Sequence, residues 1–221
     1  MPNKLILEMH NIHVRDTLKN LNLDVALGEF VLIVGANGTG KTTLFNVISG
    51  ALPVENGTII LNGVDITNTP RHIRARRISN VLQDPRRGTI GEMSILENLR
   101  LAYNRSENDI PIESKINYFK EKLSTVNMGL EDRLDDYVGN LSGGQRQALS
   151  LVMATITDYD ILLLDEITAS LDPRMADTVM TITNDIVKQE QKTCLLITHN
   201  TKHIDMYGTR ILKMKDGQLM S

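Results

Sequence analysis

Short apolar runs separated by turn residues dominate the first part of the chain. They occupy residues 5–7, 21–23 and 30–34, and each has the length of a strand. Asn62-Gly63 lies between the apolar segments 58–61 and 64–66, and this dipeptide between such segments is typical of a tight hairpin. The pattern therefore predicts several strands with at least one antiparallel pair.

Helical periodicity replaces this pattern from about residue 70 to residue 157. A shorter helix is already expected from about residue 41 to residue 49, because Gly50 is well placed to end it. In the longer region, apolar side chains recur at spacings of three and four, which predicts an amphipathic helix. They are Ile112, Ile116, Phe119, Leu123 and Val126.

Strand character returns after this region. Residues 161–164 form a continuous apolar run, typical of a strand buried on both faces of a parallel sheet. Residues 195–198 predict a second buried strand, and a helix from Pro173 to about residue 191 is expected between the two. Asp216-Gly217 predicts a closing hairpin. Together these elements favour an α/β fold.

Composition narrows the classes of function. Among 221 residues, 24 are Lys or Arg and 27 are Asp or Glu, so the net charge is −3, which predicts no general affinity for nucleic acid. Cys194 is the only cysteine and lies in an apolar run, so we expect a buried thiol and a reducing compartment. No apolar stretch approaches the roughly 18 residues that cross a bilayer, and we expect no signal peptide.

Residues 35–42 fit the pattern G-x-x-x-x-G-K-[ST], which follows an apolar strand and opens a helix. We expect Lys41 to neutralise the β- and γ-phosphates of a nucleotide and the Thr42 hydroxyl to bind Mg²⁺. An accidental glycine-rich turn is the alternative, and eight matching positions in this context disfavour it. The predicted ATP-binding residues are Gly35, Ala36, Asn37, Gly38, Thr39, Gly40, Lys41, Thr42 and Thr43.

Two acids, Asp165 and Glu166, end the buried strand at residues 161–164. Buried carboxylates are costly without a partner, and Mg²⁺ beside the phosphate loop is the partner we expect for Asp165. We assign Glu166 to polarising the attacking water. An ordinary strand end that enters solvent is the alternative interpretation.

Ser142-Gly143-Gly144-Gln145 predicts a second anion-seeking helix start. Ser142 and Gln145 fit a capping box, which does not explain the glycines. Because each glycine costs roughly 0.5–1 kcal/mol against alanine in a helix, we expect close approach by another body, the γ-phosphate on a partner molecule.

These motifs together resemble the nucleotide-binding subunits of ABC transporters over essentially the whole chain. GANGTGKT is similar to their Walker A motif, ILLLDE to Walker B and LSGGQ to the signature motif. The resemblance identifies Gln83 with the Q-loop glutamine, Asp172 with the D-loop aspartate and His199 with the switch histidine. It thus implies catalytic roles for Glu166, His199 and Gln83, and Mg²⁺ ligation by Thr42, Gln83 and Asp165.

The resemblance also implies architecture. It predicts a P-loop NTPase with a RecA-like core and a mainly parallel sheet, an N-terminal antiparallel β subdomain and an inserted α-helical subdomain. Residues 1–221 would form a single ABC ATPase domain, with the ATP-binding core and β subdomain at 1–83 and 158–221 and the helical signature subdomain at 84–157. Two copies would sandwich two ATP molecules, each contacted in trans by Ser142, Gly143, Gly144, Gln145 and Asp172.

The function implied is ATP hydrolysis that energises a membrane transporter, most similar to bacterial binding-protein-dependent importers. The expected partners are a second copy, integral membrane permease subunits and, indirectly, a substrate-binding protein. The expected location is the cytoplasmic face of the membrane. The resemblance favours amino acids or nucleosides as the transported substrate. Two other functions compete with this one: a soluble ABC protein of DNA repair or translation, and a nucleotide-dependent scaffold with little turnover.

Some features depart from the family pattern or stay open. The family stacks adenine on an aromatic residue near the N-terminus, whereas Phe30 is the first aromatic here. His10, His13 or Arg15 are the candidates to replace it, and weak base contact is the alternative. Ile167 stands where a proline commonly follows the glutamate. Six arginines between residues 71 and 87, Arg74 and Arg77 among them, are interpreted mostly as a solvated helix face, with a basic rim near the membrane subunit as the alternative.

Overall fold

The computed structural model describes residues 4–104, 112–200, 206–207 and 209–220. They divide into two compact units. The first unit contains Met1–Asn80, Asp160–Glu166 and Glu190–Ser221, and the second contains Val81–Tyr159 and Ile167–Gln189.

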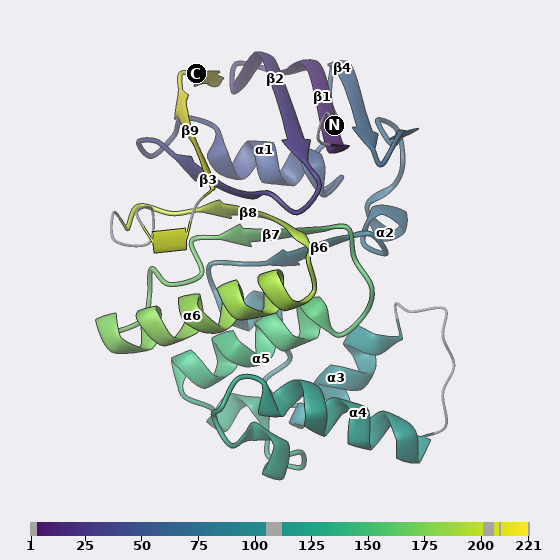
Figure 1. Ribbon diagram of the computed structural model, residues 1–221, viewed down its shortest axis with the longest axis vertical. Helices are drawn as coiled ribbons and strands as arrows, with labels where there is room; N and C mark the ends of the chain where they lie inside the picture. Colours follow the sequence, from purple (N-terminus) through teal and green to yellow (C-terminus); the bar gives the residue numbers. More distant parts are fainter. Residues whose placement is uncertain (1–3, 105–111, 201–205, 208, 221) are drawn as a thin grey trace. The chain divides into compact units, whose positions relative to one another are not determined.

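The first unit carries a four-stranded sheet of order β2-β1-β4-β5, in which neighbouring strands are antiparallel. A six-stranded sheet has the order β10-β9-β3-β8-β7-β6, and β9, β3, β8 and β7 run parallel (Figure 1). The elements are β1 (Leu5–Val14), β2 (Leu18–Ala26), β3 (Phe30–Val34), α1 (Lys41–Ile48), β4 (Asn56–Leu61), β5 (Val64–Asp65), α2 (Arg71–Arg74), β6 (Ile78–Val81), β7 (Ile161–Asp165), β8 (Thr193–Ile197), β9 (Arg210–Lys215) and β10 (Gln218–Met220).

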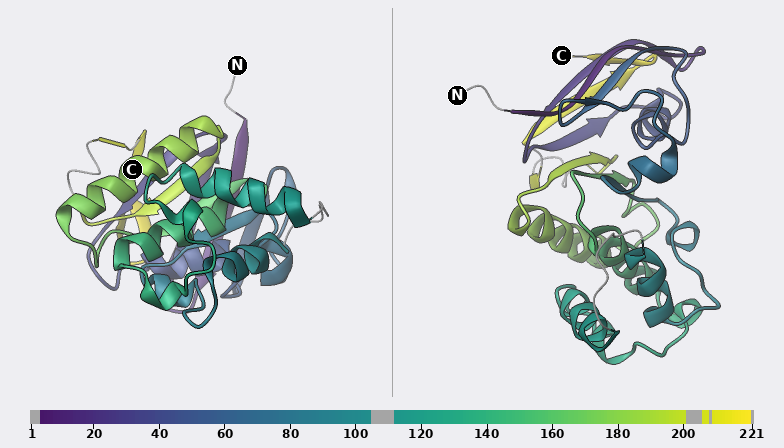
Figure 2. Two further views of the ribbon diagram at one scale, coloured as in Figure 1. Left: turned by 90° about the horizontal axis from the view of Figure 1, so that it is seen from below. Right: turned by 90° about the vertical axis from the view of Figure 1, so that its right-hand side faces the viewer.

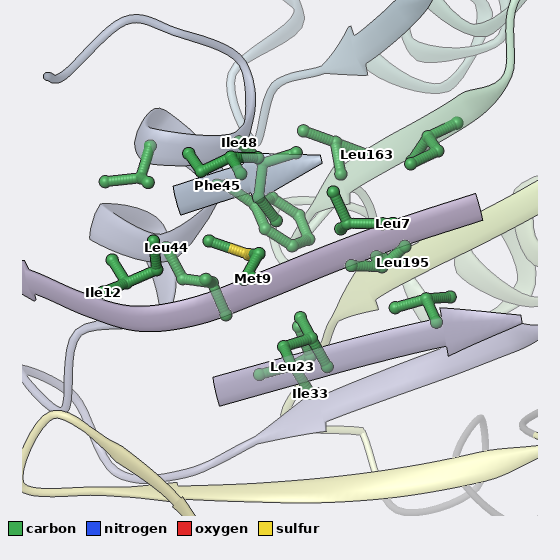
Figure 3. Close-up of a cluster of buried hydrophobic side chains, with 14 of the residues drawn as sticks. Leu7, Met9, Ile12, Leu23, Ile33, Leu44, Phe45, Ile48, Leu163 and Leu195 are labelled. Carbon is green, nitrogen blue, oxygen red and sulfur yellow. The ribbon is translucent and has the colours of Figure 1, made fainter. Parts of the chain in front are cut away.

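A hydrophobic core holds α1 against both sheets (Figure 3). Met9 and Ile12 of β1 and Leu44 of α1 are fully buried, and Phe45 is 2% exposed. Ile33 of β3 belongs to the same cluster. Since a large apolar side chain contributes about 1.5–3 kcal/mol when buried, this packing fixes the helix that follows the phosphate loop.

The second unit is helical within the part of the chain that the structure describes. Its longer helices are α3 (Ile95–Tyr103), α4 (Ile112–Ser124), α5 (Gly143–Thr155) and α6 (Pro173–Gln189), joined by the short 3₁₀ helices η1 (Pro85–Arg87), η2 (Leu130–Asp132) and η3 (Val138–Asn140). The helices α5 and α6 lie side by side (Figure 2). The predicted apolar face of α4 is confirmed, because Phe119 and Leu123 are fully buried.

Both predicted hairpins are confirmed. Asn62 and Gly63 have φ of 49° and 79°, and Asp216 and Gly217 have φ of 48° and 80°, as a two-residue hairpin turn requires. The prediction of mainly helical structure for residues 70–157 did not foresee one strand, because Ile78–Val81 forms β6 beside β7. Pairing at the edge of the sheet overrides a sequence that shows no strand alternation.

The interpretation of the arginines as a solvated face is wrong for Arg74, which is 5% exposed. Its guanidinium donates to the backbone oxygens of Val47 and Ile48 at 2.8 and 3.0 Å, near the end of α1, and to those of Thr67 and Thr69. Burial lowers the pKa of Arg74 from its usual value. A cation at this place adds donors to carbonyl oxygens in the last turn of the helix and interacts favourably with the negative end of its dipole.

Cys194 is fully buried, as expected, and desolvation raises the pKa of its thiol. The thiol therefore stays protonated and acts as a small apolar side chain. Within the described ranges, no helix has the length and apolar character needed to cross a membrane.

Candidate active site

The phosphate loop joins the end of β3 to the start of α1. Gly38 and Gly40 have φ of 80° and 102°, a left-handed conformation that favours glycine. Lys41 is 5% exposed, and its Nζ donates to the backbone oxygens of Gly35 and Ala36 at 2.8 and 3.0 Å. The lysine cation is therefore held inside the curve of the loop.

Two loop glycines also have a packing reason that sequence reasoning missed. A Cβ at Gly35 would overlap the backbone oxygen of Met214 in β9, and a Cβ at Gly40 would lie 2.9 Å from the oxygen of Thr17. The turn between β1 and β2 and the strand β9 thus press against the loop. Glycine at these positions serves the fold as well as phosphate approach.

The carboxyl ends of β3, β8 and β7 lie at one edge of the parallel sheet. The phosphate loop follows β3, Glu166 follows β7 and His199 lies just beyond β8. This edge is where ligands bind in open α/β sheets. The strand order therefore brings segments that are far apart in the sequence to the same edge of the sheet.

Glu166 and His199 are in contact. Their Oε1 and Nε2 atoms are 3.1 Å apart, and the two side chains are 22% and 45% exposed, respectively. Glu166 has φ of 48°, an uncommon conformation for a residue with a side chain, and its N–H donates to the oxygen of Ile197 at 3.0 Å. The turn directs a carboxylate and an imidazole to one place, a pair suited to orienting and deprotonating water.

Oxygen donors suited to Mg²⁺ are present in this unit. Thr42 is exposed at the start of α1, and Asp165 is half-buried at the end of β7. No group of three or more His, Cys, Asp or Glu side chains that could hold a metal ion occurs among the described residues. Mg²⁺ commonly uses one or two protein oxygens together with phosphate oxygens, and a hydroxyl and a carboxylate fit that donor set.

The signature segment begins α5 in the second unit. Ser142 Oγ accepts from the N–H of Gln145 at 3.3 Å, and Gln145 Oε1 accepts from the N–H of Ser142 at 3.2 Å. The predicted capping box is confirmed. It accounts for the first and last residues of the segment and leaves the glycines to other causes.

The two glycines of this segment have different surroundings. A Cβ at Gly144 would overlap Sδ and Cγ of Met175 in α6, whereas the nearest atom to a Cβ at Gly143 would be Cδ2 of Leu171 at 3.8 Å. Gly144 is buried and Gly143 is exposed. Sequence reasoning invoked an outside body for both glycines, but packing within the chain already explains Gly144.

The remaining predicted residues also lie in the second unit. Asp172 directly precedes α6, and its Oδ1 accepts from the N–H groups of Arg174 and Met175 in the first turn, each at 3.1 Å. Gln83 is exposed in the segment between β6 and η1. Sequence reasoning missed Arg146, whose Nε donates to Thr89 Oγ1 at 2.7 Å and links this region to α5.

The strand–loop–helix with its enclosed lysine, beside an acidic strand end on a parallel sheet, defines a P-loop NTPase. Residues 18–169 match the family described as ABC transporter. A tyrosine transport ATP-binding protein of Clostridioides difficile (strain R20291) is 41% identical over 205 residues, covering 91% of this chain and 82% of that protein.

Solved structures agree with this match. The ATP-binding cassette MJ0796, described as dimeric in a post-hydrolysis state and bound to ADP and Pi, has a TM-score of 0.85 and 25% identity, covering 98% of this chain and 97% of that one. The cbiO1 protein of Clostridium perfringens, described as part of the cbiONQ transporter complex, shares the fold with a TM-score of 0.85 and 24% identity, covering 99% and 88% of the two chains.

The chain belongs to the ABC transporter family. It is the ATP-binding subunit, and its hydrolysis of ATP energises transport. The predicted fold class is confirmed.

Proposed function

We propose that two copies of this chain form two composite sites, each with the phosphate loop of one copy and the signature segment of the other. The observation that carries this proposal is Gly143, an exposed glycine at a helix start with little of its own chain near it. A glycine here lets a partner's γ-phosphate approach the N–H groups of the first helical turn. The dimeric cassette among the structural neighbours supports this arrangement.

The proposed roles follow the motifs. Glu166 polarises water, His199 orients it towards the γ-phosphate, and Gln83 couples the site to the membrane subunit. Mg²⁺, held by Thr42, Asp165 and Gln83, would neutralise phosphate charge. ATP is bound in cis by residues 35–43 and in trans by Ser142, Gly143, Gly144, Gln145 and Asp172. The domain is divided as proposed above, with core segments 1–83 and 158–221 and a signature subdomain at 84–157.

The transporter is proposed to be an importer at the cytoplasmic face of the membrane, with permease subunits as direct partners and a substrate-binding protein as an indirect one. The relative described as a tyrosine transport protein supports an amino acid as cargo. The net charge of −3 argues against a role in binding nucleic acid.

A matched pair of variants tests the composite site. We expect Gly143→Ala to fold normally, because there is room for its methyl group, and to lose most ATPase activity and ATP-driven dimerisation. Gly144→Ala is expected instead to lower the free energy of unfolding by about 1–3 kcal/mol, because its methyl group overpacks against Met175. Adding Met175→Ala to this variant should relieve the overlap. Phosphate release, size exclusion and thermal unfolding measure these effects. Full activity in a folded Gly143→Ala protein would contradict the proposed contact in trans.

A further inference from the structure

The turn between β1 and β2, residues 15–17, lies beside the phosphate loop. The N–H of Thr17 closes the turn by donating to Val14 O at 2.9 Å. A Cβ at Gly40 would lie 2.9 Å from Thr17 O, and a Cβ at Gly217 would overlap the same oxygen. Gly217 in turn donates its N–H to Thr39 O at 3.2 Å. The turn, the β9–β10 hairpin and the loop therefore form one packed group within the first unit.

The hydrolytic side chains lie on the other side of the loop. In the sheet order, β8 and β7 are on one side of β3, and β9 and β10 are on the other (Figure 1). Glu166 and His199 follow β7 and β8. A nucleotide with its terminal phosphate towards Glu166 and His199 must extend its base towards β9 and β10, where the turn lies. This step rests on the proposed roles of those two residues.

The turn has no aromatic ring to offer a base. No aromatic residue precedes Phe30, and Phe30 itself is 4% exposed in the core. A planar cation is the other side chain on which a base stacks well, because a guanidinium group combines a flat face with positive charge. Base contact at this place therefore depends on which cationic or imidazole side chain reaches it.

The histidines of β1 lie on the wrong face of the sheet. Met9 and Ile12 are fully buried against α1, and successive side chains of a strand point to opposite faces. His10 and His13 therefore lie on the outer face, where their Nε2 atoms are 3.8 Å from Glu8 and 4.0 Å from Glu55. They face away from α1, the helix that follows the phosphate loop.

Arg15 is the remaining candidate, and it is exposed in the turn itself. Its backbone is fixed, since its N–H donates to Glu55 Oε2 at 3.1 Å and its φ is 43°. Its guanidinium makes no hydrogen bond or ion pair with any residue that the structure describes. The backbone of Arg15 is thus fixed, and its guanidinium is available to bind a ligand.

We propose that the Arg15 guanidinium stacks on the base of the bound nucleotide and is the base-contacting residue of this site. Stacking does not read the hydrogen-bonding edge of a base, so Arg15 contributes equally to adenine and guanine nucleotides.

Calorimetry with ADP, GDP and pyrophosphate tests this proposal. Because asparagine tolerates positive φ, Arg15→Asn keeps the turn. It should raise the Kd for ADP and for GDP by about three- to tenfold and leave the Kd for pyrophosphate unchanged. Arg15→His should restore part of the nucleotide affinity, because an imidazole ring also stacks and histidine is among the residues that accept positive φ. His13→Ala is the matched control and should leave all three affinities unchanged.

Three results would overturn the proposal. These are an unchanged Kd for ADP in Arg15→Asn, an equal loss of pyrophosphate affinity, which would indicate a phosphate contact, and failure of Arg15→His to restore any nucleotide affinity. Lys41→Ala separates this proposal from the assigned ATP site. If that variant still binds ADP and pyrophosphate normally, the phosphate loop assignment fails, whatever Arg15 does.

Discussion

Replacing Lys41 by alanine is expected to weaken nucleotide binding by about 100-fold or more. The ammonium group is 5% exposed and is held within the loop by the Gly35 and Ala36 oxygens. Charge-assisted hydrogen bonds contribute roughly 1.5–3 kcal/mol each. Replacing a phosphate-binding lysine by alanine removes more than one of them. Every 1.4 kcal/mol corresponds to about a tenfold change in affinity. Calorimetry with ADP measures the loss directly.

Stability needs a separate control in this variant. Without Lys41, the Gly35 and Ala36 oxygens each lose one hydrogen bond, although Thr39 still donates to Ala36 O, and we expect the free energy of unfolding to fall by about 1–2 kcal/mol. Lys19→Ala removes an exposed lysine from β2 and should change neither binding nor stability. A folded Lys41→Ala protein with unaltered ADP affinity would show that the lysine does not contact phosphate.

The Glu166→Gln variant is expected to lower kcat by about a factor of 1,000, within the usual range for loss of a general base. Glutamine has the same shape and still accepts a hydrogen bond from His199, whose Nε2 is 3.1 Å from the carboxylate in the native protein. ATP binding should therefore persist while hydrolysis stops. The ATP-bound dimer should accumulate and elute at the dimer position in size exclusion.

An exposed carboxylate outside the predicted motifs provides the comparison. Glu92→Gln removes one negative charge in the second unit and should keep normal turnover. If Glu166→Gln releases phosphate at the native rate, or remains monomeric with saturating ATP, the assigned role of Glu166 is wrong.

Local signals in the sequence predicted a large part of this fold. Asn62-Gly63 and Asp216-Gly217 predict hairpins because few other residues accept two consecutive positive φ angles. The apolar run at residues 161–164 predicts a buried strand because a parallel sheet is covered on both faces. The strand β6 was missed, since Ser79 and Asn80 interrupt its apolar residues and only pairing with the sheet defines it.

The residues of the candidate site could be predicted from the sequence only where they belong to a recognisable motif. The contacts that no motif records could not be predicted. Arg74 is one of several arginines in the sequence, and only the fold shows that it binds carbonyls at the end of α1. Met175 of α6 packs close to Gly144 of α5 because glycine has no side chain there. The unusual φ of Glu166 likewise depends on the turn after β7, not on any residue preference.

The central claim is that ATP is hydrolysed between two copies of the chain. The most direct test measures phosphate release per molecule at saturating ATP over a dilution series from micromolar to nanomolar protein, with mass photometry at each concentration. We expect the rate per molecule to fall in step with the fraction of dimer and to approach zero for monomer. A constant rate per molecule in samples that contain only monomer would contradict the claim.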